Sequence, residues 1–354
     1  MYFKPYALFL LLLLPLGVFG QFVSKTIEKQ FPLEAEGTFT LNNLFGNVNI
    51  ESWEKEQVDV KVVVKVYGKK DEDSAERLDN IYPVFETAEN RVSVTTVIEK
   101  QKNKSWWKIF NWFESNTERI QIDYWVKLPA TAELKTKNNY GSTYIDRHLG
   151  PTSLDIAYGN LAAEELRHEN NRVVIKYSDD SEIELIHGGT VVADYSDLHI
   201  GEAEDIELDV DYSKTKIGSI TDLGFSVDYG KLEIGKVATL EGDADYVGIR
   251  IEELTKSSEI DLDYGALKIY HVLPSTQRVD ISADYAGLSL GIDPNWGFDF
   301  EVITEYASLK TDLDLDYKQR IIEQVDRYYQ GRYKSGEGKL KITSDYGAVK
   351  LYKN

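Results

Sequence analysis

The sequence contains no cysteine, and this absence excludes several kinds of protein at once. Disulfide bonds, a thiol nucleophile and a lipid anchor on an N-terminal cysteine are all impossible. Histidine is also scarce: the five histidines are scattered along the chain and show no spacing typical of metal ligands. The sequence therefore gives little support to an enzyme, because it has no thiol nucleophile and no histidines at the spacing of metal ligands.

Positive charge is the second scarce feature. The chain has 40 Lys and Arg against 60 Asp and Glu, which gives a formal net charge of −20 at pH 7. A chain of this charge repels nucleic acids and anionic membrane surfaces, so we expect no nucleic acid partner. High acidity also keeps a strand-rich surface soluble and discourages association between strand edges.

Long apolar runs are absent except for one at the start of the chain, from Ala7 to Phe19. It follows the basic residue Lys4, is short for a membrane span, and ends at the small residue Gly20. This layout predicts a signal peptide over residues 1–20 and no transmembrane segment in the mature chain. A single N-terminal membrane anchor is the alternative. We expect export to the periplasm or the cell surface of a Gram-negative bacterium.

Tyrosine, in contrast, is abundant, with 23 residues, and it recurs with a regular spacing. Each repeat carries a tyrosine that is usually preceded by Asp and followed by Gly, Ser or Ala. Successive tyrosines lie 17 to 21 residues apart until a final gap of 40 residues, and they are Tyr140, Tyr158, Tyr177, Tyr195, Tyr212, Tyr229, Tyr246, Tyr264, Tyr285, Tyr306 and Tyr346. A period near 20 with strand-like content is typical of a β-solenoid.

The residues around each tyrosine alternate as in strands. Before the corner, apolar residues such as Phe225, Val227 and Tyr229 fall two apart, and after it Leu232 and Ile234 carry the apolar face. The change of parity predicts a bend at the small residue. We therefore predict an all-β fold, a single-stranded, β-helix-like solenoid with coils of about 17–21 residues. Its interior would contain ladders of Val, Ile, Leu and Tyr, spaced by ~4.8 Å.

Composition divides the mature chain into two parts. Residues 21–130 read as an N-terminal β-rich part, with strands over 58–66, 92–97 and 120–126 and an aromatic excursion over 101–118. Residues 131–354 read as the regular solenoid. A second excursion over 318–339 has Ile321, Ile322, Val325 and Tyr328 at helix-like spacing, so we expect a short helix there.

Three segments resemble a known group of bacterial proteins. They are the opening Asn43-Leu44-Phe45-Gly46, the strand Tyr124-Trp-Val-Lys-Leu-Pro129 and the later Tyr-Gly coils. Together they are similar to the bacterial "putative adhesin" family of unknown function, and the similarity covers nearly the whole mature chain. The resemblance implies an exported β-solenoid of the kind found in Bacteroidetes. It supplies no catalytic residues.

An acidic residue precedes the tyrosine in most coils, which predicts an outward ladder of carboxylates. Because like charges at strand spacing repel each other, bound Ca²⁺ could relieve the repulsion, with Asp211, Asp228, Asp245 and Asp263 as the metal candidates. Neighbouring cations could do the same without metal. They stand four residues after the tyrosine, at His199, Lys216, Arg250, Lys268, Lys310 and Lys350. We expect a structural ladder, with a metal site and contact with a carbohydrate or other ligand as the alternatives, and no other cofactor.

The segment 104–114 is the second candidate site. It concentrates aromatic side chains between two predicted strands, and the candidates for partner binding are Trp106, Trp107, Phe110, Trp112 and Phe113. Part of this set has the spacing of one helix face, so a cap over the coils is one interpretation. An exposed patch that contacts a partner, a glycan or a membrane surface is the other.

These features favour a non-enzymatic protein of the cell envelope, an adhesin-like scaffold or interaction module that binds a protein or a glycan. A carbohydrate-active enzyme of β-helix type is the alternative from another class. A periplasmic sensor or regulatory partner is a third possibility.

Overall fold

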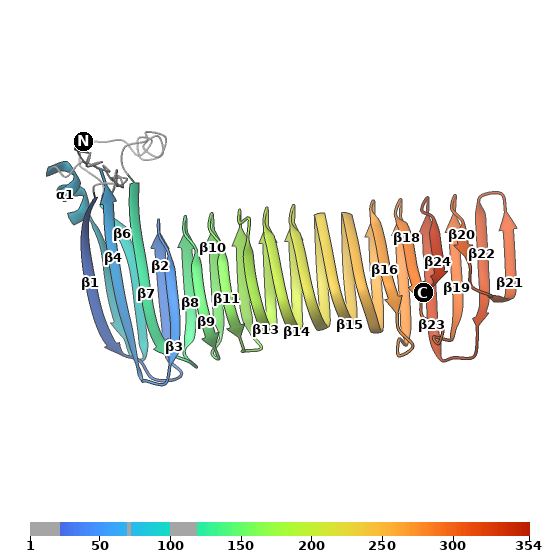
Figure 1. Ribbon diagram of the computed structural model, residues 1–354, viewed down its shortest axis with the longest axis horizontal. Coiled ribbons are helices and arrows are strands. Elements are labelled where there is room, and N and C mark those ends of the chain that lie inside the picture. The colour runs from blue at the N-terminus through green and yellow to red at the C-terminus, as the bar shows by residue number, and fades with distance from the viewer. Residues whose placement is uncertain (1–21, 69–71, 100–118) are drawn as a thin grey trace, which may run out of the picture.

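The structure is a computed structural model that describes residues 22–68, 72–99 and 119–354. The prediction of an all-β protein is confirmed, because the described residues form 24 strands in one hydrogen-bonded sheet and a single short helix, α1 (Glu72–Asp79). The strands lie side by side along the long axis of the molecule, with the blue N-terminal strands at one end and the red strands nearest the C-terminus inside the row, not at its other end (Figure 1).

Most strands belong to two parallel series that are joined at the tyrosine corners. Strands of the pre-corner series end at the corner; they are β2 (Thr38–Leu44), β8 (Glu133–Asn139), β10 (Thr152–Ala157), β12 (Asn171–Lys176), β17 (Arg278–Asp284), β19 (Phe298–Glu305) and β23 (Gly338–Asp345). Strands of the post-corner series begin after it; they are β3 (Val48–Trp53), β9 (Thr143–His148), β11 (Leu161–Leu166), β16 (Ala266–Val272), β18 (Gly287–Ile292), β20 (Leu309–Thr311) and β24 (Val349–Lys353). Three long strands contribute to both series: β13 (Ser181–Asp194), β14 (Asp197–Asp211) and β15 (Lys214–Asp263).

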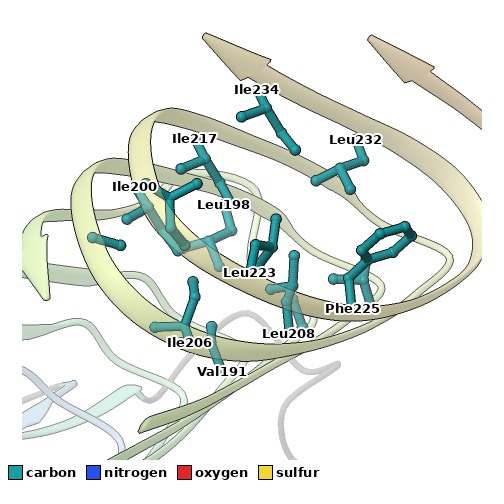
Figure 2. Packing of buried hydrophobic residues seen from close by; sticks show 14 of the residues in the cluster. Val191, Leu198, Ile200, Ile206, Leu208, Ile217, Leu223, Phe225, Leu232 and Ile234 are labelled. Carbon is teal, nitrogen blue, oxygen red and sulfur yellow. The ribbon is translucent and has the colours of Figure 1, made fainter. Parts of the chain in front are cut away.

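The register places one repeat above the next. Val191 of β13 pairs with Leu208 of β14, which pairs with Phe225 of β15, and all three side chains are buried. On the opposite series, Ile200 pairs with Ile217 in the same way. The two rows of apolar side chains face each other across a narrow interior (Figure 2). The period-two pattern of the sequence explains this core, since alternate residues of a strand lie on opposite faces.

The N-terminal end is covered by antiparallel strands. β1 (Phe22–Pro32) pairs with β4 (Gln57–Tyr67), and β4 pairs with β7 (Arg119–Pro129), which lies parallel to β3. On the other series, the hairpin of β5 (Ile81–Ala88) and β6 (Arg91–Ile98) adds to β2. The expected strands over 58–66, 92–97 and 120–126 therefore correspond to β4, β6 and β7.

The C-terminal end corrects one expectation. The segment 318–339 is not a helix but contains an antiparallel hairpin of β21 (Asp316–Glu323) and β22 (Asp326–Tyr333), in which Ile321 lies opposite Tyr328. Spacings of three and four residues also arise when a chain reverses at a tight turn. That turn lies at residues 324–325, where Gln324 adopts a positive φ of 46°. The hairpin extends the pre-corner series beyond β19.

Candidate functional site: the tyrosine ladder

The tyrosine of each repeat has an unusual backbone conformation. All eleven adopt positive φ angles between 48° and 60°, and Phe45 occupies the same position in the first coil with φ 64°. A side chain with a Cβ rarely adopts this left-handed region, at a cost of roughly 1–2 kcal/mol per residue. Hydrogen bonds from the next coil hold the corner. The amide of Tyr212, for example, donates to the carbonyl of Asp228 at 3.0 Å.

The positive φ corrects the prediction that the tyrosines are buried. Each of the eleven side chains is 44–53% exposed, so they lie outside the interior. The turn at the tyrosine carries its side chain outward, and the following small residue occupies the inner position, as the buried Ser196 and Ser213 do. The bend is therefore made by the tyrosine itself. A small residue after it is needed because the coils approach closely: a Cβ on Gly230 would lie 2.0 Å from the carbonyl oxygen of Ser213.

The exposed rings stack into one ladder. Successive tyrosine rings have centroid distances of 4.6–5.4 Å and interplanar angles of 12° or less, and the ladder begins with Phe45 over Tyr140 at 5.3 Å. This spacing is that of neighbouring strands. Because each inner ring has a ring on both sides, its faces are covered, while its edge and hydroxyl group remain accessible.

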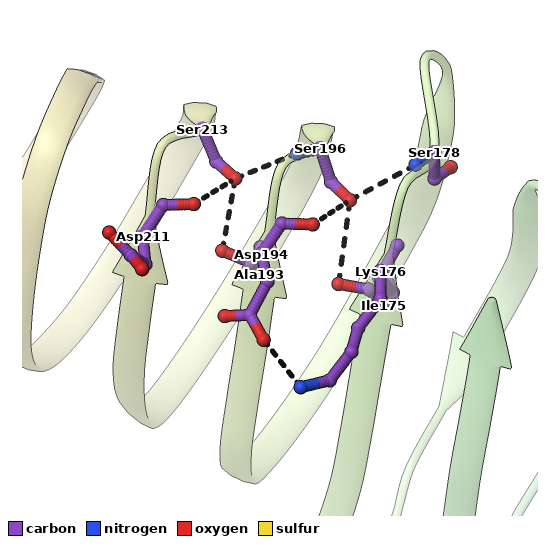
Figure 3. Close-up of polar contacts among 8 residues, drawn as sticks. All are labelled: Ile175, Lys176, Ser178, Ala193, Asp194, Ser196, Asp211 and Ser213. Atoms are coloured by element: carbon purple, nitrogen blue, oxygen red, sulfur yellow. Dashed lines mark hydrogen bonds and ion pairs between the residues drawn. The ribbon is translucent and has the colours of Figure 1, made fainter. Parts of the chain in front are cut away.

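Serines inside some corners join one coil to the next. The hydroxyl of Ser196 donates to the carbonyl of Asp194 at 2.8 Å, and the amide of Ser196 donates to the hydroxyl of Ser213 at 2.8 Å (Figure 3). These bonds satisfy polar groups that the bend would otherwise bury without a partner. They fix the geometry of the corner and hence the position of the ring above it.

The predicted acidic ladder lies beside the tyrosines. Asp194, Asp211 and Asp228 pair in register, and further along the series Asp284 pairs with Asp345. Burial and the surrounding carboxylates raise the pKa of Asp228 and Asp263. The pKa of the phenols of Tyr229 and Tyr264 is raised by the same two causes, with neighbouring phenols contributing, so these hydroxyls stay protonated.

The expected pairing with cations is not found in the described ranges. His199 pairs in register with Lys216, and Arg250 with Lys268, so these side chains form their own row on the post-corner series. Across residues 22–68, 72–99 and 119–354, the one ion pair made by a carboxylate that directly precedes a ladder tyrosine is Lys176 with Asp194, at 2.5 Å (Figure 3).

Eight more carboxylates widen the acidic ladder into a face. The pre-corner segments 205–211, 222–228, 239–245 and 257–263 contain no Lys or Arg. We call this the acidic face, and its carboxylates are Asp205, Glu207, Asp209, Asp211, Asp222, Asp228, Glu241, Asp243, Asp245, Glu259, Asp261 and Asp263. In the part of the chain that the structure describes, none of them forms an ion pair. The face therefore has a concentrated, uncompensated negative charge.

The metal candidates Asp211, Asp228, Asp245 and Asp263 all belong to this face. Among the described residues, no group of three or more His, Cys, Asp or Glu is arranged to hold a metal ion. A single row offers neighbouring carboxylates from two sides, whereas Ca²⁺ takes six to eight oxygen ligands. Calcium binding at these aspartates stays a prediction.

The aromatic candidates Trp106, Trp107, Phe110, Trp112 and Phe113 lie outside the described residues, as does the predicted signal peptide. Their role in partner binding stays a prediction. Within the described ranges, no helix is long and apolar enough to span a membrane.

Comparison with known proteins gives similarity to solved structures. No family model and no curated protein matches the sequence. A putative adhesin from Parabacteroides distasonis ATCC 8503 is 10% identical, with 77% of this chain and 98% of that chain covered and a TM-score of 0.36. A putative adhesin from Bacteroides fragilis NCTC 9343 is 12% identical, with coverages of 93% and 97% and a TM-score of 0.27. The names of these similar structures, putative adhesins of Bacteroidetes, agree with the resemblance found in the sequence. At these TM-scores the similarity carries no argument about function.

Proposed function

We propose that this chain is an exported β-solenoid of the bacterial cell envelope that acts as a non-enzymatic, adhesin-like binding or scaffold protein. In this proposal residues 1–20 direct export, residues 21–130 form the N-terminal part and residues 131–354 form the regular stack. The contact surface is the tyrosine ladder together with the acidic face.

The observation that carries the proposal is the continuous row of half-exposed rings. Soluble monomers rarely expose a contiguous aromatic surface of this length, and large exposed patches are typical of interaction sites. The bend needs a residue with positive φ, which Asn or Gly adopts at lower cost than tyrosine, so the bend alone does not explain a ring in every repeat. An extended, regular surface suits an extended or repetitive partner, since many weak contacts then act together.

The chemistry of the surface limits the partner. The phenol hydroxyls donate and accept hydrogen bonds, while the neighbouring carboxylates attract positive charge. A protein or glycan of the envelope with hydrogen-bonding groups along its length fits this surface. A polyanion does not, because the acidic face would repel it.

The test is a binding assay of the exported chain on immobilised envelope proteins and arrayed glycans. The variant Tyr212→Asn/Tyr229→Asn/Tyr246→Asn removes three adjacent rings and keeps a residue type that tolerates positive φ. We expect binding to fall at least tenfold with folding retained. The variant Lys216→Asn/Lys236→Asn on the post-corner series is the matched surface control and should bind normally. Equal binding by the ladder variant and the unchanged chain would reject the ladder as the contact surface.

A further inference from the structure

A second surface lies away from the tyrosine corners, on the outer side of the post-corner series. There β7, β3, β9, β11 and β13 lie side by side and form a hollow of about 470 Å³. One row of residues crosses the strands: Asn49 pairs with Trp125 on one side and with Tyr144 on the other, and Tyr144 pairs with Ala162. We call this hollow the Trp125 groove.

Two aromatic side chains flank the groove. Trp125 is 41% exposed and Tyr144 is 44% exposed. They lie on the two strands beside β3, hence ~10 Å apart at ordinary strand spacing. The short side chains of Asn49 and Ala162 leave the space next to the rings open. Lys61 pairs in register with Trp125 on the side of β4, so the ring surface that Trp125 and Tyr144 offer to a ligand is the part that lines the hollow.

The charge of the groove is strongly negative. Its lining includes five carboxylates and one cation, Lys127, whose ammonium group lies 2.7 Å from Glu51. The remaining carboxylates form no ion pair within the described residues; they are Asp146, Glu164, Glu182 and Glu184. Nearby cations are also engaged: Lys61 pairs with Glu28 at 3.3 Å and Arg147 pairs with Glu165 at 3.1 Å.

Asp146 is the most enclosed of the unpaired carboxylates. Its oxygens accept hydrogen bonds from the amide of Ser52 at 3.0 and 3.2 Å, which fixes the side chain beside the groove. Burial raises the pKa of Asp146, and the charges of Glu51 and Glu164 raise it further. A cation at this point would relieve both the desolvation and the repulsion.

We propose that the Trp125 groove binds the ammonium group of a lysine side chain presented by a peptide or protein partner. The apolar stem of the lysine lies along the rings of Trp125 and Tyr144, and its charge faces Asp146 and Glu164. Exposed aromatic surface next to unpaired carboxylates is the combination that selects an organic cation over a neutral ligand. The partner's charge is opposite to the net charge of the groove, which favours this occupant over a neutral sugar.

This site goes beyond the proposed function, because the groove and the tyrosine ladder use different residues and can fail separately. The probe is a short acetylated and amidated peptide with one lysine among glycines and serines, titrated into the full folded chain. Binding is followed through the indole N–H signals of the six tryptophans, with Trp125→Phe assigning the signal of Trp125. The comparison peptide carries acetyl-lysine, which keeps the stem and removes the charge.

We expect the lysine peptide to bind at least tenfold more tightly than the acetyl-lysine peptide. Trp125→Ala and Glu164→Gln should each weaken binding at least fivefold. Asp245→Asn on the acidic face and Tyr212→Asn on the ladder are the matched controls and should leave the affinity unchanged. The exposed positions of Trp125 and Glu164 make these variants safe for folding, and the conservative Glu164→Gln serves as the second test if Trp125→Ala unfolds the chain.

Three outcomes would overturn the proposal. Equal affinity for both peptides would show that the charge is not recognised. Weakening by Asp245→Asn but not by Glu164→Gln would mean that the peptide binds the acidic face through general attraction. Binding of a neutral oligosaccharide that depends on Trp125, without binding of the lysine peptide, would assign the groove to sugars instead.

Discussion

The ring of Tyr285 stacks on the ring of Tyr346, which lies 61 residues further along the chain, with a centroid distance of 4.6 Å and an interplanar angle of 1°. Tyr306, which follows Tyr285 in the repeat, stacks on the other face of Tyr346. The last coil is therefore inserted between two earlier ones: β23 pairs with both β17 and β19. The strands β17 and β19 therefore do not pair with each other, because β23 lies between them.

The first prediction concerns this inserted coil. Ile342 of β23 is fully buried, so Ile342→Ala removes apolar contacts with coils on both sides and should cost about 2–5 kcal/mol. Hydrogen exchange should rise in β17, β19 and β23 together, because each coil is stabilised mainly by its neighbours. Exchange that rises in β23 alone would contradict the insertion. Ile217→Ala in the middle of the stack is the matched control, and its effect should stay near β14 and β15.

The second prediction tests the strain at the tyrosine corner. Tyr229→Asn keeps a residue that tolerates a φ of 51°, whereas Tyr229→Val places a β-branched side chain there. Both variants lose the two ring contacts, so their difference reports the backbone alone. We expect the valine variant to be less stable by about 1–2 kcal/mol, measured by chemical denaturation. Equal stabilities would mean that the corner relaxes without a left-handed residue.

The corner also marks the limit of what the sequence could predict. Alternation in Phe225, Val227 and Tyr229 suggested that all three face inward, and it was right for the first two. Parity rules assume a continuous strand, and a positive φ at Tyr229 breaks that assumption. The sequence did contain one indication of this. A small residue follows the tyrosine and occupies the inner position at the bend, which leaves no room there for the tyrosine ring.

The prediction of a helix in the C-terminal region was wrong for a different reason. The spacing of Ile321 and Tyr328 is compatible with a helix or with two strands that reverse at a turn, and local pattern does not separate them. What decides is the free edge of β19, to which the hairpin can add. The Trp125 groove was equally hidden, because Asn49, Trp125 and Tyr144 come from three strands that only the register brings together.

The third prediction follows from the acidic face. In the folded chain the pKa of Asp228 and Asp263 is raised from the ordinary value of 3.8 by burial and by neighbouring carboxylates. A raised pKa in the folded state means that their charge destabilises the fold at neutral pH, and this penalty is relieved as the pH falls through the folded-state pKa. Asp228→Asn and Asp263→Asn should therefore raise the melting temperature at pH 7, with a gain that shrinks towards pH 3.8.

Asp299 supplies the control of opposite sign. Its pKa is lowered by the hydrogen bond from Arg332, whose Nε lies 2.6 Å from the carboxylate. Its stabilising contribution is present above the ordinary pKa and is lost as the pH falls through the lowered folded-state value. Asp299→Asn should lower the melting temperature at pH 7 or leave it unchanged. A gain at pH 7 from both kinds of variant would indicate a general effect of net charge and would contradict the local explanation.

The fourth prediction separates metal binding from charge screening at Asp211, Asp228, Asp245 and Asp263. If the row is a structural ladder, Ca²⁺ and Mg²⁺ should raise the melting temperature equally at matched ionic strength, because both only screen the repulsion. A larger shift with Ca²⁺, reversed by a chelator and lost in Asp228→Asn/Asp245→Asn, would establish a calcium site instead. Asp299→Asn is the control here, because it removes a carboxylate that does not belong to the acidic face.

The last prediction concerns the aromatic segment 101–118. Replacement of Trp106, Trp107 and Trp112 by serine should abolish capture of an envelope partner and leave the melting temperature unchanged, if these rings form a contact surface. A cap over the coils would give the opposite result, because losing buried tryptophans typically costs about 3–5 kcal/mol each. Trp296→Ala is the matched reference for a buried ring: Trp296 is 1% exposed and its indole donates to the carbonyl of Thr276 at 2.7 Å. A melting temperature that falls as far as in this reference would assign the segment to the fold, and partner capture would then have to depend on the tyrosine ladder or the Trp125 groove.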